Sequence, residues 1–264
     1  MKKSIISIGI LIISLLNTTL YSQSKLSVSY GIGGIYYMGD LKGSSLPDTK
    51  TLNIMQKAEI EVLVINPILF NLTYIHGQVE GADSIGGNVN TKSRNLHFQS
   101  NINELDLGIR LNLLNFKGKG RFTPYIHSGI GVFHFNPRAQ DDGKWVSLQP
   151  LGTEGQNLGK ADALKPYSLT QMQIPIGMGT EFKITSSFSL KTEFTYHKLN
   201  TDYLDDVSLR GNNKNNDSYF NFDISAKYTF KQKSGKFGRY SNNLAEYHKK
   251  YDKQIADACK FTFK

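Results

Sequence analysis

Hydrophobic and polar residues alternate with a period of two along eight segments of the chain. Successive side chains of a strand point to opposite faces, so each segment predicts a strand with one apolar face. The clearest segment is 104–113, whose apolar positions are Leu105, Leu107, Ile109, Leu111 and Leu113. The other predicted strands lie at 25–32, 57–64, 68–74, 125–132, 172–183, 188–197 and 220–230.

The connections between these segments alternate in length. Short turns fall at 65–67, 115–120 and 185–187, and long loops fall at 39–53, 80–95, 136–170 and 200–218. Short turns at one end and long loops at the other are typical of outer-membrane barrels. The predicted fold is therefore all-β, an eight-stranded antiparallel transmembrane β-barrel with long extracellular loops. A secreted β-sandwich is the alternative, and ten strands are possible if 136–170 contains a hairpin.

Aromatic residues near the predicted strand ends favour the same fold, because barrels carry aromatic girdles at the membrane interfaces. The residues assigned to these girdles are Tyr36, Tyr37, Phe116, Phe122, Tyr125, Phe133, Phe135, Tyr196, Tyr219 and Phe230. The last strand also closes on an aromatic residue, Phe230, which is similar to the terminal signal of outer-membrane barrels.

The N-terminus has the three parts of a secretory signal peptide. Lys2 and Lys3 precede an apolar run at 5–16, and a small residue, Ser22, offers a cleavage point. The apolar run is too short to span a membrane comfortably, and a buried N-terminal helix is the alternative. We expect residues 1–22 to be the signal peptide, 23–230 the barrel and 231–264 a periplasmic tail. The expected location is the Gram-negative outer membrane, with both termini in the periplasm.

Charge is concentrated in the tail. The chain of 264 residues has a formal net charge of +9, and 231–264 holds nine Lys or Arg against three acidic residues. The barrel segment is close to neutral, so the basic pI does not predict a nucleic-acid partner. Composition also argues against a disordered chain, because 15 Phe, 14 Tyr and one Trp are too many rings to leave unburied.

The tail has a helical pattern after a flexible basic linker. One apolar face is formed by Leu244, Tyr247, Tyr251 and Ile255, at spacings of three or four residues. A helix this short needs a surface to pack on. Three surfaces are candidates: the inner leaflet of the outer membrane, a periplasmic ring protein and the mouth of the barrel. A disordered tail is the remaining alternative. Cys259 is expected to be inert.

Charged residues recur on the polar faces of the predicted strands, which line the interior of a barrel. The predicted luminal network consists of Glu104, Asp106, Arg110, His127, Glu181, Lys191, Glu193 and Asp223. A barrel of eight strands is filled by its own side chains, so a general porin is disfavoured.

No catalytic residue, metal site, cofactor or small-molecule substrate is predicted. His127 and Ser128 resemble a hydrolase pair, but neighbouring strand residues point to opposite faces. Asp202, Asp205 and Asp206 lie close in sequence, where a turn-forming role is expected and Ca²⁺ binding is the alternative. The apolar content of the loops 136–170 and 200–218 predicts that they pack on each other as an ordered cap.

Several segments resemble one family of small barrels, the PorG-like proteins associated with the type IX secretion system. Two loop motifs are the most specific, and their residues are Gly152, Thr153, Glu154, Gly155 and Gln156 in one and Thr201, Asp202, Tyr203, Leu204, Asp205 and Asp206 in the other. The resemblance implies a non-enzymatic barrel that assists or anchors the secretion machinery and contacts outer-membrane lipid and periplasmic ring proteins. A structural or surface-binding barrel without a secretion role is the alternative.

Overall fold

The computed structural model describes residues 25–39, 41, 50–85, 96–114, 120–156, 163–209 and 216–230. The strands within them are β1 (Lys25–Met38), β2 (Asn53–Ile65), β3 (Ile68–Ala82), β4 (His97–Asn112), β5 (Phe122–Asp141), β6 (Lys144–Ser147), β7 (Thr170–Lys183), β8 (Phe188–Leu199) and β9 (Ser218–Thr229). A short 3-10 helix, η1, spans Gln149–Leu151. No helix among the described residues is long and apolar enough to cross a membrane. The signal peptide and the tail helix, with Leu244, Tyr247, Tyr251, Ile255 and Cys259, lie outside the described residues.

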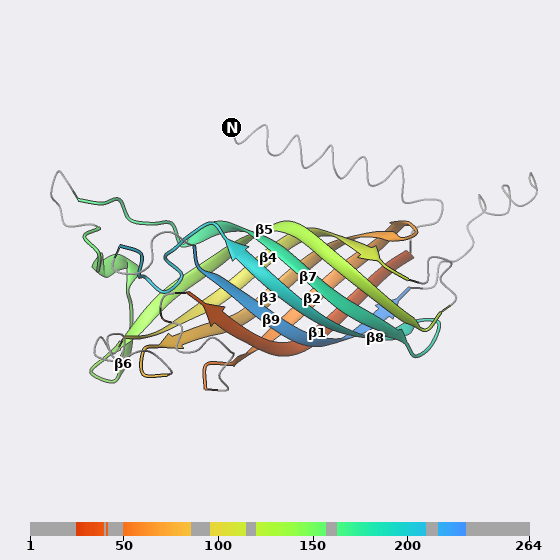
Figure 1. The fold of residues 1–264 in the computed structure, drawn as a ribbon, viewed down its shortest axis with the longest axis horizontal. Coiled ribbons are helices and arrows are strands. Elements are labelled where there is room, and N and C mark those ends of the chain that lie inside the picture. The colour runs from red at the N-terminus through yellow and green to blue at the C-terminus, as the bar shows by residue number, and fades with distance from the viewer. Residues whose placement is uncertain are drawn as a thin grey trace, which may run out of the picture. The chain divides into compact units, whose positions relative to one another are not determined.

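Eight of the strands form a closed antiparallel barrel (Figure 1). The order around the barrel is β1-β2-β3-β4-β5-β7-β8-β9, and β9 pairs again with β1 from Ser27 opposite Thr229 to Met38 opposite Ser218. Closure leaves no free sheet edge, which is a requirement for strands that cross a lipid bilayer. The predicted all-β fold with eight antiparallel barrel strands is confirmed, and a two-sheet sandwich is excluded.

The long segment 136–170 contains a hairpin, which the sequence analysis gave as a possibility. β5 turns at Asp142 and Gly143, which have positive φ angles of 45° and 76°, and β6 pairs back on it. Asp-Gly suits this two-residue turn because both central positions need positive φ. β6 pairs only with the far end of β5, so the hairpin adds no strand to the barrel wall.

The outer face of the barrel carries an apolar belt. Along β4 the belt begins at Leu105 and continues to Leu113, the residue just after the strand, and Leu107 is 63% exposed. Nine strand positions at a tilt near 40° correspond to a height of about 20–25 Å, close to the apolar band of membrane barrels. Exposed leucines, isoleucines and phenylalanines continue this belt on β5, β7, β8 and β9.

Some strands extend beyond the belt. We call the end with β6 and η1 the loop end, and the end with the short β2–β3 and β7–β8 connections the turn end (Figure 1). Toward the loop end the outward residues of β3, β4 and β5 become polar, as at His76, Asn103 and His134. β3 to β5 have 15, 16 and 20 residues, whereas β8 and β9 have 12, so one side of the wall continues past the belt.

The predicted aromatic girdles are partly wrong. Five of the assigned residues are at most 1% exposed and belong to the interior: Tyr37, Tyr125, Phe133, Phe135 and Tyr219. Tyr36 is also buried and packs on Phe220, with ring centroids 5.2 Å apart. Phe122, Tyr196 and Phe230 are exposed, and Phe116 lies outside the described residues. For Tyr37, Phe133, Phe135 and Tyr219 the error arises because the interior near the loop end is apolar, so rings there form a core. Tyr125 instead contacts Arg110 and Glu193 of the buried charges.

Candidate functional site

The middle of the barrel holds a network of buried ion pairs. Nζ of Lys57 lies 2.6 Å from Oε1 of Glu193 and 2.8 Å from Oδ2 of Asp223. These side chains come from β2, β8 and β9 and meet across the lumen. Each is at most 6% exposed, so the charges are removed from water and depend on one another.

A second part of the network surrounds Arg110 on β4. Its guanidinium lies 2.8 Å from Oε1 of Glu61 and 2.7 Å from Oε2 of Glu181, and it lies over the ring of Tyr125 at 3.7 Å. Lys227 lies 2.5 Å from Oε2 of Glu61 and 3.0 Å from Oε2 of Glu181. Two carboxylates and two cations thus form one buried cluster.

Lys191 and His127 complete the network. Lys191 donates to Glu59 and lies 3.3 Å from Oε1 of Glu61. Nε2 of His127 is 3.4 Å from Oε1 of Glu193. The structure thus places Arg110, His127, Glu181, Lys191, Glu193 and Asp223 in one luminal network, whereas Glu104 and Asp106 form a separate cluster nearer the loop end.

Sequence reasoning omitted several members of the network. These are Lys57, Glu59 and Glu61 on β2. His197 on β8, which belongs to the separate cluster of Glu104 and Asp106, was omitted as well. The available signal was strand periodicity, since Lys57, Glu59 and Glu61 occupy every second position of β2 and so share one face.

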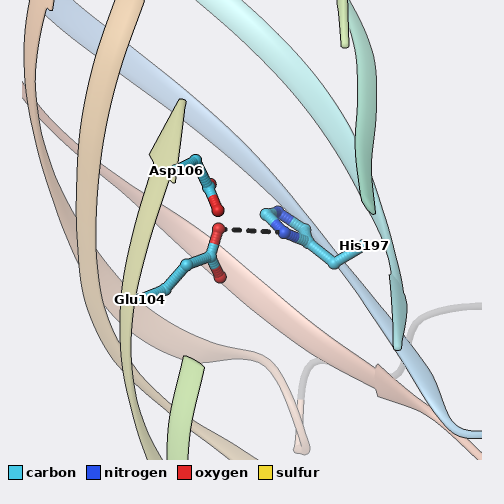
Figure 2. Close-up of side chains that lie close together, drawn as sticks. All are labelled: Glu104, Asp106 and His197. Atoms are coloured by element: carbon cyan, nitrogen blue, oxygen red, sulfur yellow. Dashed lines mark ion pairs between the residues drawn. The ribbon is translucent and has the colours of Figure 1, made fainter. Parts of the chain in front are cut away.

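Glu104, Asp106 and His197 form a compact buried cluster (Figure 2). Oε1 of Glu104 lies 3.1 Å from Nδ1 of His197. Tyr219 donates its hydroxyl to Glu104, and its ring stacks on the imidazole with centroids 4.3 Å apart. β4, β8 and β9 therefore contribute to a single polar layer between the ion pairs and the loop end.

Two amide side chains connect this cluster to its surroundings. Gln173 donates from Nε2 to Oδ1 of Asp106 at 2.8 Å, and its carbonyl Oε1 lies 2.9 Å from Nδ1 of His197. Asn221 places Oδ1 2.6 Å from Nε2 of His197 and donates from Nδ2 to Asp223 at 3.3 Å. The imidazole therefore has a defined oxygen partner at each ring nitrogen.

An apolar layer closes the interior at the loop end. Its buried residues include Ile35, Met55, Val79, Phe98, Ile102, Phe133, Phe135 and Leu204. This apolar layer lies between the polar layers and the loop end. Together the layers fill the described part of the lumen with side chains, as expected for eight strands.

The loops at this end pack on the apolar layer. Tyr167 stacks between Phe135 and Tyr203, with centroids 6.2 Å and 4.5 Å away. Leu204 is buried, and Trp145 packs edge-on against His97. The described parts of 136–170 and 200–218 are thus in contact, although one apolar residue of the first loop, Leu151, is 58% exposed.

The two family-like loop motifs contact each other directly. Thr153 donates to Oδ2 of Asp206 at 2.5 Å, and the carboxylate of Glu154 accepts the backbone N–H groups of Ser208 and Leu209 at 3.1 and 2.9 Å. Within the first motif, Glu154 donates its backbone N–H to Gln156 at 3.1 Å. Gly152 has φ 61°, and Gly155 has φ 99°, so glycine suits both turn positions.

The aspartates of the second motif accept hydrogen bonds from the protein itself. Tyr37 donates to Asp205 at 2.6 Å and to Asp217 at 2.9 Å, and Asp205 also accepts the N–H of Val207 at 2.9 Å. Tyr167 donates to Asp206, whose pKa is raised above the ordinary aspartate value by burial. Thr201 accepts the N–H of Tyr203, and Asp202 is half-buried beside it. These contacts are those of turn-forming side chains.

His127 and Ser128 point to opposite sides of the barrel wall. Nε2 of His127 faces inward, 3.3 Å from the hydroxyl of Thr195, whereas Ser128 donates to the backbone oxygen of Pro175 at 3.0 Å. A nucleophile must lie within hydrogen-bond reach of its base. The two side chains therefore do not form a catalytic pair.

Glu154→Ala is expected to loosen the segment 201–209. The substitution leaves two backbone N–H groups without their acceptor, at a cost of about 1–2 kcal/mol. Local opening should rise about 5- to 30-fold, which proteinase K cleavage of the barrel in lipid vesicles would measure. Glu154→Gln keeps one acceptor oxygen and should show a smaller increase. An unchanged cleavage rate within 201–209 for Glu154→Ala would contradict this role.

The closed eight-stranded wall, the apolar outer belt and the charged interior together define the outer-membrane β-barrel fold. Residues 4–237 match DUF6089, described as a domain of unknown function, and the chain belongs to this family. No curated protein matches the sequence.

Solved outer-membrane proteins are similar in structure. Neisserial surface protein A has a TM-score of 0.47 at 11% identity, covering 79% of this chain and 100% of its own. A major outer membrane protein of Thermus thermophilus has a TM-score of 0.45 at 14% identity, with coverage of 79% and 100%. OprG of Pseudomonas aeruginosa has a TM-score of 0.43 at 11% identity, with coverage of 79% and 97%.

Proposed function

We propose that this protein is a non-enzymatic outer-membrane barrel that acts as a membrane anchor for other envelope proteins. The observation that carries the proposal is the filled interior, in which buried ion pairs and an apolar layer occupy successive levels of the lumen. Such a barrel offers no path for solutes. Its function therefore belongs to its surfaces, namely the lipid-facing belt and the two ends.

The placement of the barrel's ends supports a location of both termini on the periplasmic side. The first and last strands pair side by side, and Phe230 donates its backbone N–H to Leu26 at 2.9 Å. The short connections lie at this same end, and short turns are periplasmic in outer-membrane barrels. The long loops then face the outside.

The particular role we propose is an accessory or anchoring component of the type IX secretion machinery, with periplasmic ring proteins as partners. The support is the resemblance of the motifs at 152–156 and 201–206 to the PorG-like family. The two motifs also contact each other directly, since Thr153 and Glu154 of one motif bind Asp206 and the N–H groups just after the other. A structural or surface-binding barrel is the second candidate, favoured by the ordered contacts of the loops.

Deletion of the gene separates the two roles. For a secretion component, we expect type IX cargo to disappear from the culture medium and accumulate in the periplasm, measured by quantitative mass spectrometry. Envelope integrity, assayed by detergent sensitivity, should stay normal, and the wild-type gene supplied in trans should restore secretion. Normal secretion in the deletion strain would overturn the secretion role, and a leaky envelope with normal secretion would favour the structural one.

A further inference from the structure

The charges of the barrel interior do not balance at the Glu104–Asp106–His197 cluster. Seven carboxylates lie on the inward faces of the strands: Glu59, Glu61, Glu104, Asp106, Glu181, Glu193 and Asp223. The buried permanent cations on these faces are Lys57, Arg110, Lys191 and Lys227. Their ion pairs all go to the other five carboxylates, and among the described residues no lysine or arginine pairs with Glu104 or Asp106. Buried carboxylates are neutralised either by a cation or by a proton.

The geometry points to a metal ion as that cation. We propose that Glu104, Asp106 and His197 bind one divalent transition-metal ion of the zinc class inside the barrel. The three residues are at most 5% exposed, and one ligand atom from each lies within 4.8 Å of the others. Oε1 of Glu104 is buried and accepts no hydrogen bond; its neighbour is Nδ1 of His197 at 3.1 Å. Figure 2 shows the two carboxylates and the imidazole turned toward one another.

Each proposed ligand is held by a further residue, as ligands of metal sites are. Tyr219 donates to the other oxygen of Glu104, Oε2. Gln173 donates to Asp106, and Asn221 offers a carbonyl oxygen to Nε2 of His197 at 2.6 Å. That carbonyl fixes the proton on Nε2 and leaves a lone pair on Nδ1. This lone pair faces two oxygen atoms, Oε1 of Glu104 at 3.1 Å and Oε1 of Gln173 at 2.9 Å, and a cation between them would relieve the repulsion.

The donor set selects the class of metal. One imidazole nitrogen with two carboxylates suits Zn²⁺ and its neighbours, whereas Ca²⁺ and Mg²⁺ prefer six or more oxygen ligands or retained water. A small cavity of about 20 Å³ lies against Asp106 and His197, enough for one water molecule. The competing occupants are protons: one would make His197 an imidazolium donating to both Gln173 and Asn221, and a second would be shared by the carboxyl groups of Glu104 and Asp106.

The test is the metal content of the full-length mature barrel. The protein is refolded into detergent with ZnSO₄, passed through a desalting column and analysed by inductively coupled plasma mass spectrometry. We expect about one Zn²⁺ per barrel. Glu104→Gln and His197→Gln should lower the content to below about 0.1 per barrel, because each removes a ligand. His127→Gln is the matched control, since His127 is also luminal and faces a glutamate, and it should keep the ion.

The outcomes separate the occupants of the cluster. Wild-type protein without stoichiometric zinc would overturn the proposal and leave bound protons to neutralise the cluster. Zinc retained by both ligand variants would also overturn it, because the ion would then be bound adventitiously elsewhere. If those variants do not fold, Tyr219→Phe removes only the hydroxyl that orients Glu104 and should weaken zinc binding about 10- to 100-fold. Tyr37→Phe, also buried and hydrogen-bonded to carboxylates, should not. Equal zinc affinity of the two Phe variants would overturn the proposal.

Discussion

Replacing Leu107 by arginine is expected to lower the free energy of unfolding of the barrel by about 2–4 kcal/mol. Leu107 points outward from β4, is 63% exposed and lies opposite Leu72 of β3 and Ile130 of β5 within the apolar belt. In a bilayer this position faces hydrocarbon, so a guanidinium there loses its hydration. Urea unfolding in lipid vesicles, followed by circular dichroism, measures the difference.

Leu107→Met is the matched control for this prediction, because it keeps an apolar side chain of similar volume. It should change the free energy of unfolding by less than about 1.5 kcal/mol. The same two variants in a soluble sandwich would differ little at an exposed position. Equal stability of Leu107→Arg and Leu107→Met in vesicles would contradict the assignment of the β4 outer face to lipid.

The number and positions of the barrel strands could be predicted because the belt imposes a simple rule. Where a strand crosses lipid, its outward residues are apolar and its inward residues polar, as in 104–113. The predicted strand begins at residue 104, whereas β4 begins seven residues earlier, at His97. Over that extension the rule reverses, since Phe98 and Ile102 are buried inside and Gln99 and Asn103 face outward.

This reversal also explains the misassigned aromatics near the loop end. Past the belt the wall meets water outside, and the lumen is covered by loops, so the strand follows the pattern of a soluble core. Phe133 and Phe135 of β5 therefore point inward, next to Tyr167 of a loop. A single sequence does not show at which residue the belt ends, because alternation continues unbroken through the change.

The sequence predicts which residues belong to the interior network better than it predicts which of them form ion pairs with each other. A charged residue in mid-strand is enough to place its side chain in the lumen. The partner, however, depends on the stagger between strands that are far apart in sequence, as for Lys57 and Asp223. The Glu104–Asp106–His197 cluster was missed for this reason, since His197 lies on β8, on the other side of the lumen from β4.

Lys57→Met should lower the free energy of unfolding by about 3–5 kcal/mol, because breaking a buried ion pair leaves an uncompensated charge. Lys57 is 2% exposed, and among the described residues it is the cation that pairs with Asp223, which is 0% exposed. Glu193 is affected less, because Lys191 and His127 lie 3.9 Å and 3.4 Å from its carboxylate. Urea unfolding in vesicles provides the measurement.

The double variant Lys57→Met/Asp223→Asn tests whether the cost comes from the charge or from lost packing. Removing the orphaned carboxylate should restore at least about half of the loss, since a neutral amide is far cheaper to bury than a charge. Lys198→Met is the matched lysine control: Lys198 lies at the exposed loop end of β8 and should change stability by no more than about 0.5 kcal/mol. If the single and double variants are equally unstable, the ion pair is not the source of the effect, and Lys57 contributes through its packed aliphatic chain instead.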